Sequence, residues 1–138
     1  MQVKKPAIVQ ILPSLESGGV EQGTLDMAEA IVKKGWSSFV ISSGGIMVKT
    51  LAEKGSHHIT LPLDTKNPLK ILKNAIKIAR IIRNNKINIV HARSRAPAWS
   101  AYLASRMTKT CFIATVHGAY RNSNPLKRFY NAIMLRGS

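Results

Sequence analysis

The chain has 138 residues, of which 45% are hydrophobic, and this is enough to bury the core of a single domain. Its 21 lysine and arginine residues outnumber 6 aspartate and glutamate residues, and the net charge of +15 favours an anionic partner (nucleic acid, an anionic membrane surface or a phosphorylated small molecule), unless it only keeps the surface soluble. The sequence shows neither a signal peptide nor an apolar run of the roughly 18 residues that span a membrane, and its one cysteine, Cys111, is expected in the core of a cytoplasmic protein.

Short apolar strands alternate with helices along the whole chain. The first strand, over 7–12, leads through a loop to the pair Gly18-Gly19 and to a helix over 20–34, which Gly35 ends. Further strands are predicted over 36–42, 58–61, 87–92 and 111–116, and further helices over 47–54, 67–85, 96–107 and 126–135. Strands without polar alternation need cover on both faces, so this order predicts one α/β domain with a doubly wound parallel sheet.

The longest predicted helix, over 67–85, carries an apolar and a basic stripe. Asn67 suits its N-cap and Pro68 its first position. The stripe expected to face the core consists of Leu69, Leu72, Ile76, Ala79 and Ile82. The basic residues expected on the opposite face are Lys70, Lys73, Lys77 and Arg80. This basic face is predicted either to rest on anionic membrane lipid or to be an ordinary solvated helix face.

In a doubly wound sheet, ligands bind beyond the carboxyl ends of the strands where the strand order reverses, here between the first and fourth strands. The residues that the loops bring to this predicted crevice are Gly18, Gly19, His91, Arg93, Arg95, His117 and Gly118. Glycines let the N–H groups of a helix N-terminus approach an anion, and arginine binds phosphate, so the set suits phosphates and sugar hydroxyls. His117 is the candidate acid, base or hydrogen-bond donor.

Each of these residues also has a purely structural interpretation. The glycine pair can simply shape a tight strand-to-helix connection. His91 and His117 can be satisfied strand-end histidines, and Arg93 and Arg95 can cap the following helix or lie on the surface. The remaining histidines, expected on the surface away from the crevice, are His57 and His58.

Several other kinds of site do not fit the sequence. The glycines do not form G-x-G-x-x-G, no acidic residue follows the second strand, and no Lys-Ser/Thr follows the glycines, which argues against dinucleotide and P-loop sites. One cysteine, few carboxylates and no G-x-S-x-G argue against a metal site and a nucleophile elbow. Nucleic acid is not an expected partner, because the basic residues are not interleaved with aromatic ones.

Three stretches, at 15–26 (Leu-Glu-Ser-Gly-Gly-Val-Glu-Gln-Gly-Thr-Leu-Asp), 89–101 (Ile-Val-His-Ala-Arg-Ser-Arg-Ala-Pro-Ala-Trp-Ser-Ala) and 115–120 (Thr-Val-His-Gly-Ala-Tyr), together resemble family-4 retaining glycosyltransferases. The likeness is greatest to bacterial enzymes of the lipopolysaccharide-core and cell-surface glycan type, and residues 124–131 fit the same subgroup. The resemblance covers nearly the whole chain. It implies a GT-B fold, in which two Rossmann-like domains face a cleft.

The resemblance also implies roles for individual residues. It identifies 1–138 as the acceptor-side, N-terminal domain, without the C-terminal domain that carries most nucleotide-sugar contacts and the Glu-x7-Glu motif. Gly18 and Gly19 would lie near the donor diphosphate, and His117 at the reacting centre. The residues that would contribute to donor or acceptor binding beside them are Arg93, Arg95 and Gly118. Many relatives carry Arg where this chain has Gln22, so one phosphate-directed charge is missing here.

The implied function is transfer of a sugar from a nucleotide-sugar donor to a glycolipid or lipopolysaccharide-core acceptor at the inner face of the cytoplasmic membrane. No metal ion or further cofactor is expected. Without the second domain, the 138 residues are not expected to complete the transfer alone. The alternative function is that of a non-catalytic basic module, which binds anionic membrane lipid or a separate chain carrying the C-terminal half.

Overall fold

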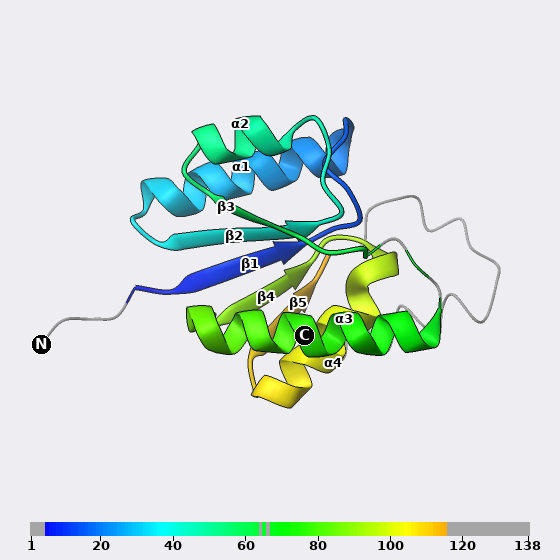
Figure 1. Cartoon of the computed structure of the whole chain (residues 1–138). Helices are drawn as coiled ribbons and strands as arrows, with labels where there is room; N and C mark the ends of the chain where they lie inside the picture. Colours follow the sequence, from blue (N-terminus) through cyan, green and yellow to red (C-terminus); the bar gives the residue numbers. More distant parts are fainter. Residues whose placement is uncertain (1–4, 64, 66, 116–138) are drawn as a thin grey trace, which may run out of the picture.

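The computed structural model describes residues 5–63, 65 and 67–115, and shows a sheet of five parallel strands in the order β3-β2-β1-β4-β5 (Figure 1). The strands are β1 (Ala7–Ile11), β2 (Ser37–Ser42), β3 (His57–Thr60), β4 (Ile89–Ala92) and β5 (Cys111–Ala114). The helices are α1 (Gly19–Lys33), α2 (Val48–Glu53), α3 (Pro68–Asn85) and α4 (Arg95–Thr108). The predicted doubly wound α/β fold is therefore confirmed, while the helix expected over 126–135 lies outside the described residues.

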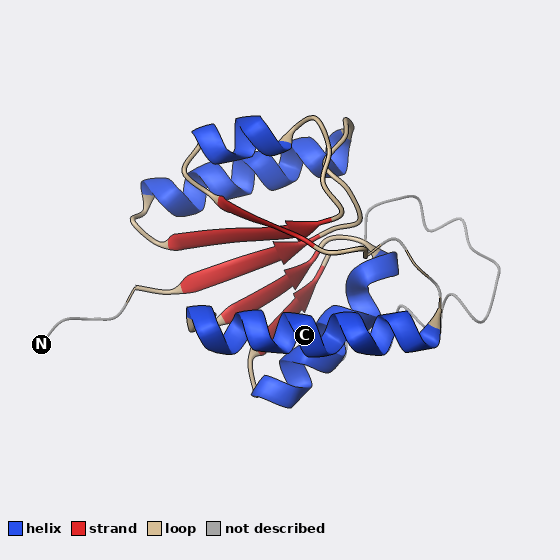
Figure 2. Cartoon of the chain, viewed as in Figure 1, coloured by secondary structure: helices blue, strands red, loops and turns tan. Residues whose placement is uncertain are grey.

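The helices form two layers, with α1 and α2 on one face of the sheet and α3 and α4 on the other (Figure 2). Successive strand residues point to opposite faces, so β1 contributes to both layers. Val9 and Ile11 of β1 join the larger core beneath α3 and α4, whereas Leu12, directly after β1, joins the core with Leu25 of α1. Gln10, on the α1 side, is fully buried although it is polar.

Local signals in the sequence set the ends of two helices as predicted. Asn67 is the N-cap of α3, its side-chain oxygen accepts the N–H of Leu69 at 2.9 Å, and Pro68 is the first helical residue. Gly35 follows the end of α1 at φ 81°, a left-handed conformation that favours glycine.

The prediction that one apolar stripe of α3 faces the core is wrong for the first three residues of that stripe. The exposed fractions of Leu69, Leu72 and Ile76 are 72%, 48% and 47%. The residues that α3 does bury are Asn74, Ala75, Ile78, Ala79 and Ile82. The Asn74 amide is satisfied by donating to the Pro62 carbonyl at 3.0 Å. Because α3 carries apolar residues on more than one row, the packing against α4 and the sheet decides which row is buried.

Two further expectations are corrected. Cys111 is exposed rather than in the core, because β5 buries the alternate residue, Phe112, against Tyr102 of α4. His58 does not lie freely on the surface: it is half-buried in β3, with Nε2 2.6 Å from Ser42 Oγ, and burial lowers its pKa. His57, in contrast, is exposed as expected.

Candidate functional site

The strand order reverses between β1 and β4, as predicted. Each of these strands is hydrogen-bonded to the other, with Gln10 opposite His91 and Ile11 opposite Ala92. β1 leads into α1 on one face, and β4 leads into α4 on the other. The carboxyl ends of the two strands therefore bring together the start of α1 and the segment 93–95, where the polar residues of the predicted site lie.

The two glycines before α1 have different reasons to be glycine. Gly18 is the N-cap, with φ 147°, and a Cβ there would lie 3.3 Å from the Glu21 carboxylate. A Cβ on Gly19, the first residue of α1, would have no atom of the described part of the chain within 4 Å. Backbone geometry thus explains Gly18, whereas Gly19 leaves space next to the first turn of α1. Among residues 5–63, 65 and 67–115, no side chain caps this helix end, so these residues leave its first N–H groups available to an anion.

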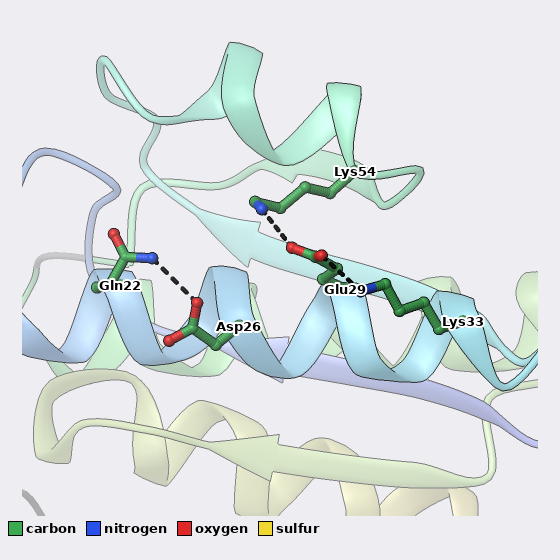
Figure 3. A network of polar contacts seen from close by, with 5 residues as sticks. All are labelled: Gln22, Asp26, Glu29, Lys33 and Lys54. Atoms are coloured by element: carbon green, nitrogen blue, oxygen red, sulfur yellow. Dashed lines mark hydrogen bonds and ion pairs between the residues drawn. The ribbon is translucent and has the colours of Figure 1, made fainter.

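A carboxylate already complements the positive end of α1. Glu21 lies in the first turn, and its carboxylate lies close to Gly18. An anionic ligand at this helix end would compete with it or displace it. Gln22, at the position where the resemblance leads one to expect arginine, donates from Nε2 to Asp26 Oδ1 at 3.0 Å along the helix surface (Figure 3).

The loop before α1 is held by the loop between β2 and α2, for which the sequence predicted no role in the site. The Leu15 N–H donates to the Gly44 carbonyl at 2.9 Å, and the Met47 N–H donates to the Leu15 carbonyl at 2.9 Å. Gly45, at φ 151°, passes so close that a Cβ would lie 2.4 Å from the Leu15 carbonyl oxygen. The signal for this contact was the Gly44-Gly45 pair itself, which marks a close approach of two backbones.

Arg93 is buried, so neither of its structural interpretations, helix cap or surface residue, holds. Only 6% of the residue is exposed, and Nε donates to Gln10 Oε1 at 2.5 Å. Gln10 Nε2 donates in turn to the Thr24 carbonyl of α1 at 3.2 Å. Nη1 lies 3.4 Å from the place that a Cβ on Gly23 would occupy. The side chain therefore reaches from β4 across β1 to the first half of α1.

No carboxylate among the described residues forms an ion pair with Arg93. Burial lowers its pKa, but a guanidinium remains protonated in proteins. Its partner, Gln10, supplies a neutral oxygen, and a buried cation without a counter-ion is costly. A positive charge is thus held beside the amino-terminal half of α1, where the helix dipole is also positive, and both favour an anion. Gln10 and Gly23 were missed in the sequence, although a glutamine in an apolar strand and a glycine inside a helix were visible signals.

The other predicted residues divide between those that the structure describes and those that it does not. His91 is half-buried, and its Nε2 lies 2.5 Å from Thr115 Oγ1, just after β5. Arg95 is half-buried as the first residue of α4. The two that lie outside the described residues, and whose roles stay predictions, are His117 and Gly118.

Within 5–63, 65 and 67–115, no group of three or more His, Cys, Asp or Glu side chains is arranged to hold a metal ion. The same residues contain no helix that is both long and apolar enough to cross a membrane.

Comparison with known proteins identifies the family. The model of Glycosyltransferase Family 4 matches residues 17–137. A glycosyltransferase from Rickettsia africae ESF-5 is 46% identical, with a TM-score of 0.85 over 99% of this chain and 36% of its own. MurG from Acinetobacter baumannii (18% identity, TM-score 0.72, 96% of this chain and 40% of its own) has the same fold. A putative UDP-N-acetylglucosamine 2-epimerase from Listeria monocytogenes also has this fold, with 14% identity and a TM-score of 0.66 over 96% of this chain and 38% of its own.

The chain thus spans well under half the length of these solved proteins. No curated protein sequence matches it at a significant level. Its α/β sheet is the Rossmann-like fold of the N-terminal domain of GT-B glycosyltransferases. Because the family model covers most of the chain, the chain belongs to glycosyltransferase family 4.

Proposed function

We propose that this domain forms the acceptor-side half of a retaining glycosyltransferase, which transfers a sugar from a nucleotide-sugar donor to a lipopolysaccharide-core or other cell-surface glycan acceptor. The family match and the 46% identity to a bacterial glycosyltransferase support the reaction class. The net charge of +15 supports an anionic, phosphorylated acceptor. The resemblance of the three sequence stretches to lipopolysaccharide-core enzymes supports the acceptor class.

The observation that carries the proposal is the buried Arg93 beside the uncapped start of α1. A nucleotide-sugar diphosphate would bind near Gly19, where there is space, with the N–H groups of the first turn and the positive charge of Arg93 facing it. These groups would balance the negative charge of the leaving diphosphate without a metal ion. On this proposal, Arg95 and Gly118 would contribute to binding of the donor or acceptor, and His117 would act at the reacting centre.

The solved Rickettsia relative matches this chain over 36% of its own length, so we place the remaining donor contacts in a second domain. We therefore test turnover after joining the chain to the C-terminal domain of that relative. The assay mixes the chimera and radiolabelled nucleotide sugars with membrane vesicles that contain lipopolysaccharide with a truncated core. It then measures the radiolabel that is transferred to the lipid. NMR of the product's anomeric centre then distinguishes retention from inversion.

Two variants make the test specific. His117→Ala should lower kcat by about 100-fold or more if the histidine acts at the reacting centre. His57→Ala, an exposed histidine on β3, is the matched control and should leave turnover unchanged. Near-normal turnover of His117→Ala would return that residue to a structural role. A folded chimera with no transfer to any acceptor would favour the alternative, a non-catalytic basic module.

A further inference from the structure

We propose that the exposed face of α3 docks this domain on an anionic lipid bilayer, through a row of apolar side chains beside a row of basic ones. This surface is separate from the site between β1 and β4. The docking goes beyond the proposed transfer reaction and does not depend on it.

The apolar row consists of Leu69, Leu72 and Ile76, with exposed fractions of 72%, 48% and 47%. Steps of three and four residues place these side chains next to one another on one side of the helix. They are not part of the core, because α3 buries a different row against α4 and the sheet. Three adjacent large apolar side chains thus face away from the protein core, in contrast to single surface apolar residues, which need no explanation.

The basic row runs alongside it, through Lys70, Lys73, Lys77 and Arg80, all exposed. The helix contains no aspartate or glutamate, and none of these four cations forms an ion pair with a described acidic residue. Like charges at these spacings repel, and Lys70 lies in the first turn, where a positive charge opposes the helix dipole. An anionic surface would convert both unfavourable effects into attraction.

The two rows together select a lipid surface over a protein partner. The exposed face offers only positive charge and a narrow apolar row, which suits phosphate headgroups with shallow insertion of side chains at the acyl boundary. A helix of 18 residues is about 27 Å long, enough to lie flat on the bilayer. α3 follows β3, so its first half, with the apolar row, lies at the carboxyl edge of the sheet (Figure 1). The part of α3 that inserts is therefore the part nearest the edge of the sheet that holds the candidate site.

The first test is co-sedimentation of the 138-residue chain with vesicles of phosphatidylcholine, with and without phosphatidylglycerol. We expect binding to the phosphatidylglycerol vesicles that weakens steeply with added salt, and weak binding to phosphatidylcholine alone. Equal binding to both compositions, or to neither, would overturn the proposal.

The second test removes the apolar row at constant charge. The combined variant L69S/L72S/I76S should bind phosphatidylglycerol vesicles at least about tenfold more weakly, while its circular dichroism and thermal midpoint show that it stays folded. Unchanged binding would exclude insertion by α3. If the wild type is instead a dimer that this variant dissociates, and neither protein binds vesicles, the row is a protein contact and the lipid proposal is wrong.

The third test removes the basic row. The variant K70Q/K73Q/K77Q should lose at least about tenfold in affinity and show a flatter salt dependence. The matched control, K33Q/K34Q/K49Q, lowers the net charge equally but changes exposed residues of the α1–α2 layer. It should bind as the wild type does. An equal loss in this control would mean that net charge, and not α3, attracts the vesicles, which would contradict the proposal.

The insertion of α3 into the bilayer can also be measured at a single position by fluorescence quenching. In vesicles with brominated acyl chains, the added fluorescence of Leu72→Trp should be quenched, whereas that of Ile46→Trp should not. Ile46 is 76% exposed, in the loop before α2 and away from α3. Equal quenching at both positions, or none at position 72, would refute the proposed orientation.

Discussion

The buried pair Arg93–Gln10 allows a quantitative test, because each partner can be removed separately. Gln10→Leu leaves the guanidinium buried with no partner at Nε, and leaving an uncompensated charge in the interior typically costs about 3–5 kcal/mol. Arg93→Met instead removes the charge and leaves only the neutral Gln10 Oε1 unpaired. An unpaired neutral acceptor lowers the free energy of unfolding by about 1–3 kcal/mol, and this loss is partly offset because no charge has to be buried.

The double variant Gln10→Leu/Arg93→Met removes both polar groups and should recover most of the stability that Gln10→Leu loses. We expect Gln10→Leu to be the least stable of the three, with a coupling energy of about 2–3 kcal/mol in the double-mutant cycle. Urea denaturation at neutral pH, followed by circular dichroism, measures these differences, and equal m-values confirm that the transition stays comparable.

A control separates the pair from the overall charge of the protein. Lys49→Met removes an exposed positive charge on α2 and should change stability by less than about 0.5 kcal/mol. The reasoning is refuted if Gln10→Leu is as stable as the wild type, or if the double variant is no more stable than Gln10→Leu. The folded Arg93→Met protein then serves for pyrophosphate titration by NMR, where we expect affinity to fall at least about tenfold.

Three further predictions follow from single residues. Gly45→Ala should lower the free energy of unfolding by at least about 2 kcal/mol, because a Cβ would lie 2.4 Å from the Leu15 carbonyl; a urea midpoint near that of the wild type would contradict this contact. Gly19→Ala should leave stability within about 1 kcal/mol, because its Cβ meets open space, yet weaken pyrophosphate binding; unchanged binding would mean that the glycine only shapes the connection. Hydrogen bonds from Lys54, and then from Lys33, lower the pKa of Glu29 from its ordinary 4.5 to about 2 (Figure 3). The Glu29 carboxylate therefore stabilises the fold above about pH 4.5 and loses this effect as the pH falls towards 2, so thermal midpoints of Glu29→Gln and wild type should differ at neutral pH and converge in acid.

Over the residues that the structure describes, the sequence alone determined the order of elements and the doubly wound sheet, because its signals are local. Apolar runs of strand length, the Asn67-Pro68 helix start and glycines at helix ends act within a few residues, and the structure confirms each of them. The reversal between β1 and β4 also followed from the element order, since right-handed connections leave few alternatives. The predicted roles of His117 and Gly118 stay predictions.

Tertiary structure decided what local patterns left open. Arg93 and Gln10 are 83 residues apart, so nothing near Arg93 in the sequence showed that it is buried rather than a cap or a surface residue. α3 carries apolar residues on more than one row, and only packing against α4 and the Asn74–Pro62 contact chose which row faces the core. The periodicity of a helix identifies its apolar rows but not its rotation against a neighbour, because that rotation depends on the shape of the surface it meets.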